Sequence, residues 1–174
     1  MEDIMITTNR LIITTFQEEM AESVYLNSLD EDTRTFVPDE VFASEQEARE
    51  VIRFLMRCYK GLEGPFVYPV LLTSGECIGY VQAVHMGSEW EVGYHIASQH
   101  TGRGYATEAL TAFLPVIMAK LNIEEIWGIC RSDNGASRRV LEKCGFELVF
   151  SGTDHYAGQS CRVCKYVYRG TERL

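Results

Sequence analysis

The spacing of apolar residues changes abruptly across residues 99–106, and this change constrains the fold more than any other feature. Before it, runs at 66–73, 77–86 and 90–96 are rich in β-branched and aromatic residues and are separated by short turns that contain glycine, a pattern typical of strands. After it, apolar residues recur at helical spacing from 104 to about 122. A set of strands that leads directly into a long helix predicts a sheet with helices on its faces.

The remaining segments extend this pattern in both directions. Further strands are predicted at 9–14, 125–130, 146–152 and 162–168, and further helices at 17–28, 44–59 and 134–144. Ser44 and Glu47 form a capping box that starts the second of these helices. We therefore predict an α+β fold, with one domain over residues 1–174 built on a mixed central sheet of about seven strands and about four helices. Pro115 lies inside the long helix, which either bends there or is two pieces.

The composition argues against several classes of protein. The chain has 174 residues, 46% hydrophobic and 24% charged, which suits one packed domain, and no apolar run approaches the roughly 20 residues that a membrane span needs. Residues 1–87 carry the formal net charge of −9, so nucleic acid is not an expected partner. This acidic half either attracts a cationic substrate or serves only solubility. Met1, Glu2 and Asp3 show no secretory leader, and six scattered cysteines indicate a cytoplasmic protein with reduced thiols.

Cys161 and Cys164 form a CxxC pair, a spacing found in metal and redox sites. A structural zinc site needs four ligands, and the sequence contains no second pair. The pair also falls at the start of a predicted strand, where an offset of three places the two sulfurs on opposite faces. We therefore expect no metal.

Residues 99–106 (QHTGRGYA) connect the first set of strands to the long helix. Gly102 and Gly104 allow the backbone to turn tightly and present successive N–H groups, and the first turn of the helix adds its unpaired amides. Arg103 can add a charged contact. Such a loop favours a phosphate or pyrophosphate ligand, although an ordinary turn can have the same residues. The segment is neither a dinucleotide fingerprint nor a P-loop.

Several motifs in this order resemble those of the GCN5-related N-acetyltransferases, the GNAT superfamily. Residues 99–106 resemble the Gln/Arg-x-x-Gly-x-Gly/Ala motif that holds the pyrophosphate of acetyl-CoA in that family. Residues 91–94 (EVGY) resemble the strand before the motif, and residues 134–137 (NGAS) with 141–146 (LEKCGF) resemble its Asn-x-x-Ser and Glu-Lys-x-Gly-Phe signatures. Residues 9–13 (NRLII) are similar to the first strand of the RimJ/RimL branch of ribosomal-protein N-acetyltransferases.

The resemblance implies an acetyl-CoA-dependent N-acetyltransferase that moves the acetyl group to a primary amine by direct attack in a ternary complex. Such chemistry needs a base for the amine, which is protonated near neutral pH, and a proton donor for the departing thiolate. Glu91 is the expected base, on a strand face shared with Gly93 and His95, although exposed strand glutamates are equally common; Glu89 is the alternative. Ser137 is the expected donor, unless its hydroxyl only satisfies its own helix.

The resemblance also implies which residues bind acetyl-CoA. The strand at 90–96 splays from its neighbour in related enzymes, so Val92, Tyr94 and Ile96 are expected to line the slot. Asn134 is expected to cap its helix and to contact the cofactor. The loop contributes Gln99, Gly102, Arg103, Gly104, Tyr105 and Ala106. Three more side chains could reach the 3′-phosphate or lie in solvent: Arg138, Arg139 and Lys143.

Two other functions stay open at this point. A non-catalytic acyl-CoA-binding or sensor module would keep the fold without the chemistry, and the loop could hold another phosphate-containing ligand such as a nucleotide. The acceptor amine could belong to a protein N-terminus, a polyamine, an amino acid or an aminoglycoside. His155 and Tyr156 could border its pocket, although a plain loop is the simpler interpretation. No membrane partner is expected, and the chain could be a monomer or a homodimer.

Overall fold

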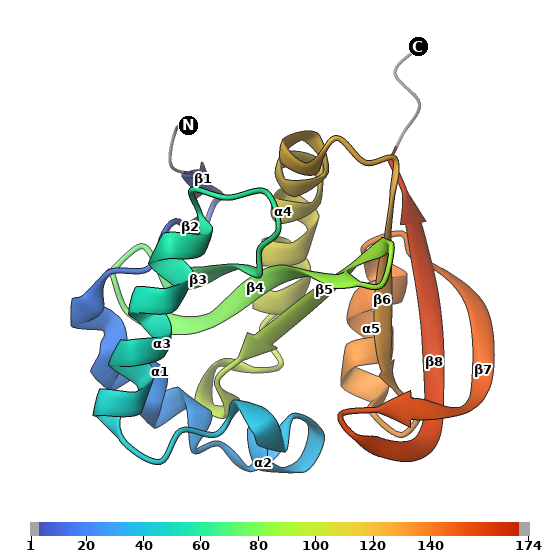
Figure 1. Ribbon diagram of the computed structural model, residues 1–174, viewed down its shortest axis with the longest axis horizontal. Coiled ribbons are helices and arrows are strands. Elements are labelled where there is room, and N and C mark those ends of the chain that lie inside the picture. Colours follow the sequence, from blue (N-terminus) through green and yellow to red (C-terminus); the bar gives the residue numbers. More distant parts are fainter. Residues whose placement is uncertain (1–3, 171–174) are drawn as a thin grey trace.

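The computed structural model describes residues 4–170, and its strands form one mixed sheet (Figure 1). Met1 to Asp3, on which the expectation of no leader rested, lie outside the described residues. The strands are β1 (Ile6–Thr7), β2 (Leu11–Ile13), β3 (Phe66–Leu72), β4 (Cys77–Met86), β5 (Glu89–Ile96), β6 (Glu125–Arg131), β7 (Glu147–Tyr156) and β8 (Gln159–Arg169). Their order in the sheet is β1-β2-β3-β4-β5-β6-β8-β7, and all neighbours are antiparallel except β5 and β6.

Among residues 4–170, five α-helices accompany the sheet, together with three short 3₁₀ turns. The helices are α1 (Ala21–Ser28), α2 (Glu31–Phe36), α3 (Glu45–Cys58), α4 (Tyr105–Leu121) and α5 (Gly135–Lys143). The predicted α+β fold with a mixed sheet is confirmed, with one strand and one helix more than expected. The extra strand, β1, has two residues, and α2 buries Thr33 alone among its six, so neither leaves an apolar period in the sequence.

The helices cover both faces of the sheet. Figure 1 shows α1 and α3 on one face and α4 and α5 on the other. Between α1, α3 and the sheet lies a small apolar cluster of Phe16, Ala21, Ile52, Leu55 and Val67. The larger core lies on the α4 and α5 side, where Phe113, Leu114 and Ile117 of α4 meet Phe66, Tyr68 and Val70 of β3. In the described range 4–170, no helix is long and apolar enough to cross a bilayer.

The N-terminus of α3 has the cap that its sequence predicts. The Ser44 hydroxyl accepts a hydrogen bond from the Glu47 N–H at 3.1 Å. The Glu47 carboxylate reaches back and accepts from the N–H of Ala43 at 2.5 Å, one residue before the expected partner. Ala48, Ile52 and Leu55 are then buried at helical spacing.

The long helix α4 runs unbroken through Pro115. The proline therefore does not divide the helix into two pieces, which was one of the two possibilities that the sequence allowed. Leu114 and Ile117 on either side are buried in the core, and this burial offsets the hydrogen bond that a proline cannot donate. The helix starts after Gly104 and ends at Asn122, and both of these residues have positive φ.

The two halves of the sheet meet at a short seam between β5 and β6. These parallel strands pair only at Glu91 with Trp127 and at Val92 with Gly128. Beyond Val92, no residue of β5 has a partner on β6, whereas β5 stays paired with β4 through to Ile96. The expected splay is confirmed, and it opens one edge of β5 at the place where the site is found.

Candidate active site

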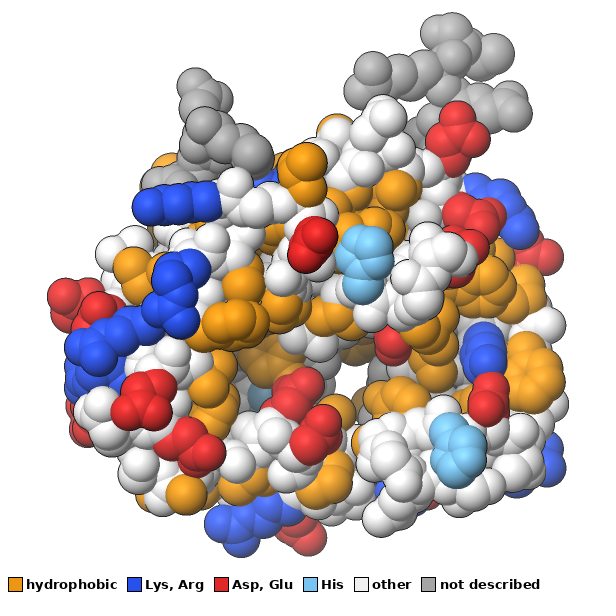
Figure 2. All heavy atoms as spheres, viewed as in Figure 1, with side chains coloured by type: hydrophobic (Ala, Val, Ile, Leu, Met, Phe, Trp, Pro, Cys, Tyr) orange, Lys and Arg blue, Asp and Glu red, His pale blue; other side chains and the backbone are white. Residues whose placement is uncertain are grey.

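A cavity of about 640 Å³ follows the splay between β5 and β6. It is lined by residues of β5, of the loop and first turn of α4 between positions 100 and 107, of β6 and of α5 along its length. Figure 2 shows the molecule hollowed at its centre, with acidic side chains around the opening. Because the strands separate there, the cavity reaches both faces of the sheet.

The loop before α4 has the backbone geometry of an anion site. Gly102 and Gly104 have φ angles of +75° and +80°, a region in which glycine is favoured. A Cβ placed on Gly102 would meet nothing within 4 Å, so this stretch of backbone faces open space. Gly102, Gly104, Tyr105 and Ala106 all line the cavity, and α4 begins directly after Gly104. The free N–H groups and the positive end of the helix dipole therefore meet at this end of the cavity.

Two residues expected in this loop stand apart from the cavity lining. The Gln99 side chain is exposed on a 3₁₀ turn, Ser98–His100, that directs it to solvent. Arg103 is also exposed, and its backbone carbonyl accepts a hydrogen bond from Arg10 Nη1 at 2.9 Å. The residues that line the cavity at this end include Gly102, Gly104, Tyr105 and Ala106, and the roles predicted for Gln99 and Arg103 in cofactor binding stay predictions.

Arg10 supports the loop from the other end of the chain. Its Nε donates to Glu108 Oε2 at 2.7 Å, and its guanidinium lies 4.5 Å above the centre of the Tyr105 ring. Glu108 also accepts from the hydroxyl of Thr8 at 2.6 Å. The segment between β1 and β2 therefore holds the first turns of α4. Sequence reasoning used Arg10 only as part of a motif and assigned it no role.

Alternation along β5 divides its side chains between the two faces of the sheet. Val92 and Ile96 are buried on the α4 side, where Tyr94 packs against the same core. Glu91 and His95 lie on the α1 and α3 side, opposite Val84 and Tyr80 of β4. All five β5 residues line the same cavity. Glu89, the alternative base, starts the strand and is not among the lining residues.

Glu91 is a half-buried carboxylate in this cavity. Within residues 4–170 it has no hydrogen bond or ion pair through its side chain. Burial raises the pKa of Glu91 to about 7, and the charge of Lys165 acts in the opposite direction. A carboxylate with a pKa near 7 can take up a proton and release it again at neutral pH.

On the other face of β5, Tyr94 and Ser137 form a pair of hydroxyl groups. The two oxygens lie 2.8 Å apart, and the Tyr94 hydroxyl is also 3.0 Å from the Ser137 carbonyl oxygen. Burial raises the pKa of Tyr94 well above its usual value, so its proton is retained. The Ser137 N–H donates to Asn134 Oδ1 at 3.1 Å, which makes Asn134 the cap of α5. Asn134 and Ser137 both line the cavity.

Glu40 and Tyr156 join the site from distant segments that carry no recognisable motif. Burial raises the pKa of Glu40 to about 7, and the neighbouring charge of Asp39 raises it further. Tyr156 ends β7, and burial followed by the charges of Glu91, then Cys130, then Glu40 raises the pKa of its hydroxyl. Both side chains line the cavity, whereas His155 is exposed outside its lining.

His95 connects β5 to α2. Its Nε2 lies 3.1 Å from the Thr33 hydroxyl and 3.6 Å from Asp30 Oδ2. Burial lowers the pKa of His95, against the effect of the Asp30 charge, so the ring is neutral at pH 7. Asp30 also accepts from the N–H of Ser98 at 2.6 Å. These contacts fix α2 beside the cavity.

The basic residues of α5 separate into two groups. Arg139 and Lys143 line the cavity, whereas the Nε of Arg138 donates to the hydroxyl of Tyr166 at 3.3 Å. The CxxC pair lies elsewhere, on β8, where Cys164 is buried and Cys161 is half-buried. Over the described residues, no group of three or more His, Cys, Asp or Glu side chains is arranged to hold a metal ion.

Comparison with known proteins gives one family. A family model described as an acetyltransferase (GNAT) domain matches residues 10–147. The uncharacterized N-acetyltransferase YnaD of Bacillus subtilis is 29% identical over 143 residues, which are 80% of this chain and 81% of YnaD. Among solved structures, the ribosomal-protein-S5-alanine acetyltransferase of Vibrio fischeri superimposes with a TM-score of 0.85 at 15% identity, over 98% of each chain. RimL, a ribosomal L7/L12 α-N-protein acetyltransferase in complex with coenzyme A, gives 0.80 at 18% identity, over 95% of this chain and 98% of RimL.

Proposed function

The chain belongs to the GNAT acetyltransferase family, and from this premise we propose that it moves an acetyl group from acetyl-CoA to a primary amine by direct attack within a ternary complex. Residues 1–174 would act as one N-acetyltransferase domain. When bound, acetyl-CoA supplies a thioester whose carbonyl carbon bonds to the amine nitrogen while its carbon–sulfur bond breaks. The amine loses a proton, and the sulfur gains one.

The cavity fits a diphosphate followed by a narrow arm. The backbone at Gly102 faces open space in front of the α4 N-terminus, and a Cβ on Gly104 would lie 3.5 Å from Arg10 Nη2, so the loop offers free N–H groups beside a guanidinium, which suits the pyrophosphate. The β5 edge beyond Val92 has no partner strand, so its N–H and C=O groups are available to hydrogen-bond an extended amide chain. Asn134 at the cap of α5, with Arg139 and Lys143 on the same helix, lines the side of this path.

Glu91 would accept the proton of the attacking amine. It faces the α1 and α3 side of the sheet, it has no protein partner in the described range, and its pKa is raised to about 7. A base with this pKa is ionised in a substantial fraction of molecules at neutral pH and still binds a proton well. Such a group contributes roughly 10²–10⁴ in rate.

Tyr94 and Ser137 would supply the proton that the sulfur gains. They lie on the α4 and α5 side of β5, opposite Glu91, and their hydroxyl oxygens are 2.8 Å apart. The raised pKa of Tyr94 keeps its phenol protonated at neutral pH, so it would be present as a hydrogen-bond donor to the negative charge that develops on the sulfur. The free backbone N–H groups of β5 would meanwhile stabilise the developing charge on the carbonyl oxygen.

One observation carries this proposal: a proton acceptor and a pair of proton donors lie on opposite faces of one strand and line the same cavity. A thioester placed in the splay would have the amine on one side and the departing sulfur on the other. The acceptor could be a protein N-terminus, as the names of RimL and the S5-alanine enzyme suggest by analogy, or a small amine.

The test is release of free CoA from acetyl-CoA with a panel of primary amines, with the acetylated product identified by mass spectrometry. We expect turnover that Glu91→Gln and Ser137→Ala each reduce by at least about tenfold while acetyl-CoA still binds. Binding of acetyl-CoA with no turnover on any amine would contradict the proposal and favour a non-catalytic sensor. Unchanged turnover in both variants would contradict the proposed roles of Glu91 and Ser137, but it would not contradict acetyl transfer by the protein.

A further inference from the structure

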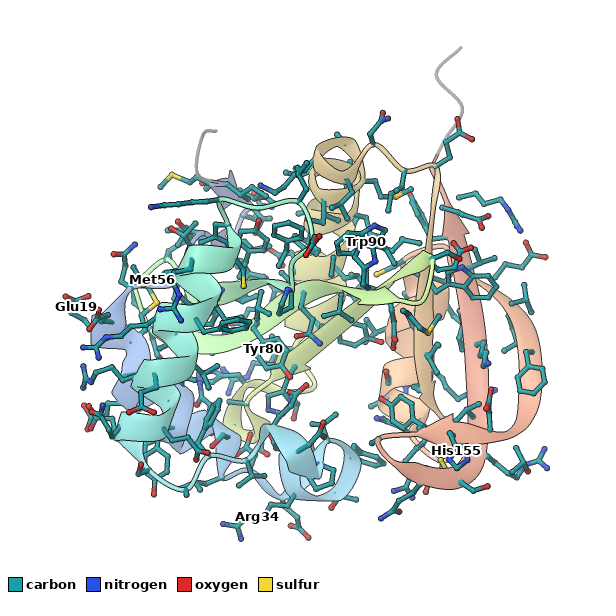
Figure 3. All side chains as sticks on the ribbon, viewed as in Figure 1. Glu19, Arg34, Met56, Tyr80, Trp90 and His155 are labelled. Carbon is teal, nitrogen blue, oxygen red and sulfur yellow. The ribbon has the colours of Figure 1, made fainter. Side chains whose placement is uncertain are left out.

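A second cavity, of about 280 Å³, lies between α1, α3 and the sheet. It is adjacent to the first cavity, because four residues line both: Glu40, Tyr80, Gln82 and His95. Figure 3 marks one of them, Tyr80, on β4 near the centre of the sheet. All the residues that line the second cavity lie between Phe16 and His95 in the sequence.

The inner walls of this cavity are apolar. They are formed by side chains of α1, α3, β3 and the segments beside them, including Phe16, Val24, Phe42, Val51, Leu55 and Val67. Three of the polar side chains in the lining have protein partners: Asn27 Nδ2 donates to the Cys77 carbonyl at 3.0 Å, the Ser28 hydroxyl donates to the Tyr25 carbonyl at 2.7 Å, and Thr33 is held by His95. The lining also includes the carboxylates of Asp39, which is exposed, and Glu40. Away from these two carboxylates, a ligand group in this cavity would meet mainly hydrocarbon.

The mouth of the cavity is polar. The Glu40 carboxylate has no hydrogen bond or ion pair within the part of the chain that the structure describes, and it faces both cavities. The Gln82 side chain lies over Gly93, since a Cβ on Gly93 would come within 2.6 Å of its Nε2. Gly93 is the residue of β5 between Glu91 and His95 on this face. The carboxylates of Glu40 and Glu91 and the amide of Gln82 therefore lie where the apolar walls end.

We infer that the acceptor is a primary amine that carries one uncharged apolar substituent, which enters the second cavity while the amine stays at its mouth between Glu40 and Glu91. The inference rests on the proposed function and names the substrate class of that same site. An apolar cavity of about 150 Å³ is enough to hold a benzene ring, so 280 Å³ accepts an aromatic or branched aliphatic group.

The same cavity disfavours two of the acceptor classes that the sequence left open. A polyamine would place a second ammonium group, and an aminoglycoside would place hydroxyl and ammonium groups, against walls that are apolar away from Asp39 and Glu40. Burial of such groups without partners costs several kcal/mol. Apolar substituents are favoured there because they leave water without losing a partner. This substrate class includes a free primary amine with an apolar substituent and a peptide whose N-terminal residue has an apolar side chain, because each places an amine beside an apolar group.

The experiment compares kcat/KM for matched acceptors at saturating acetyl-CoA. The free amines are ethylamine, 2-phenylethylamine and spermidine, and the peptides are Phe-Ala-Ala amide and Ser-Ala-Ala amide. We expect 2-phenylethylamine to exceed ethylamine by at least about tenfold, with spermidine no better than ethylamine. The ratio between the two peptides then shows whether an N-terminal residue uses the same cavity.

A variant of the cavity wall tests the location. Val24→Phe fills space on α1, and we expect it to remove the preference for 2-phenylethylamine while the rate with ethylamine stays within about twofold. Leu26→Phe, at a position on the same helix that is 56% exposed and outside the lining, is the control and should keep the preference. Equal rates for ethylamine and 2-phenylethylamine in the unmodified protein would overturn the inference and leave the proposed function intact. A preference that survives Val24→Phe would overturn the location, and no acetylation of any amine would overturn both.

Discussion

The Tyr94 hydroxyl lies 2.8 Å from Ser137 Oγ, and this pair joins β5 to the first turn of α5 across the splay of the sheet. Tyr94 is also 3.0 Å from the Ser137 carbonyl oxygen, which can only accept. Since a hydroxyl carries one proton, Tyr94 donates to that carbonyl and the serine hydroxyl donates to the Tyr94 oxygen. The two hydroxyls are therefore hydrogen-bonded in series and both protons are held within the protein, so one hydroxyl would have to turn toward the sulfur in order to donate to it.

Removal of one hydroxyl of this pair should impair proton delivery to the sulfur. We expect Tyr94→Phe to lower kcat by about 10–100-fold with little change in the KM for acetyl-CoA, since the ring that lines the cavity is kept. The measurement is steady-state kinetics of Tyr94→Phe, Ser137→Ala and the double variant. Because the two hydroxyls act in series, the double variant should be little worse than the poorer single variant. Fully additive losses would show that they act independently.

The pH dependence of kcat should report Glu91. The carboxylate acts as a base only when ionised, and its pKa is about 7. At saturating amine, kcat should therefore fall about tenfold for each pH unit below 7 and level off above it. Glu91→Gln should lower kcat by about 10²-fold and remove this inflection. Glu89→Gln, on the same strand but outside the cavity, is the control and should keep the profile.

Burial of the Glu40 carboxylate should make this residue destabilise the folded protein at high pH. Its pKa is about 7 in the folded protein against 4.5 as the ordinary value, so the folded state holds the proton more tightly than the unfolded state does. The free energy of unfolding should then fall as the pH rises from about 4.5 to 7. We expect Glu40→Gln to stabilise the protein by about 1–3 kcal/mol at pH 8 and by much less at pH 4.5, measured by urea denaturation. A variant less stable than the unmodified protein at pH 8 would contradict this.

The loop at Gly102 should be needed for affinity more than for folding. Gly102→Ala places a methyl group in the open space that the backbone faces and strains a residue with φ of +75°. We expect the Kd for acetyl-CoA, measured by calorimetry, to rise at least about tenfold. Gly75→Ala is a matched control, since Gly75 has φ of +92°, an equally open surrounding and a position in the turn between β3 and β4. It should cost similar stability and leave the Kd unchanged.

Much of the fold could be predicted because its elements have strong local signals. The capping box at Ser44, the apolar stripe of α4 and the alternating strands each depend on residues close together in the sequence. The two missed elements lack such signals for different reasons. The strand β1 pairs with the nearby β2, at Ile6 with Ile13 and Thr7 with Ile12, but its two residues are too few to show an alternating pattern. The helix α2 is held by the contact of Thr33 with His95, which is 62 residues along the chain.

The site likewise contains residues that local sequence could predict and residues that it could not. The loop at 99–106 and the cap at Asn134 are local backbone devices, so their positions could be read from glycine and asparagine spacing. Glu40 enters the cavity only through the tertiary fold, and nothing near it in sequence marks it. Tyr156, which the sequence offered with His155 as a possible border of the acceptor pocket, lines the cavity, whereas His155 does not. Gln99 matched a motif, yet the structure turns its side chain outward, because a short 3₁₀ turn sets its direction.

The apolar cavity is built entirely from residues before Ala97, whereas the loop, the cap of α5 and the serine hydroxyl all come after it. The proposed acceptor cavity therefore belongs to the first 96 residues, whereas the proposed cofactor site draws on both stretches, since Tyr94 and the free edge of β5 come before Ala97. An exchange of residues before Ala97 between two such genes would change the acceptor cavity, but it would also replace one of the two strands at the β5–β6 seam. Diversification of this kind would therefore have to keep Glu91, Val92 and Tyr94 on β5.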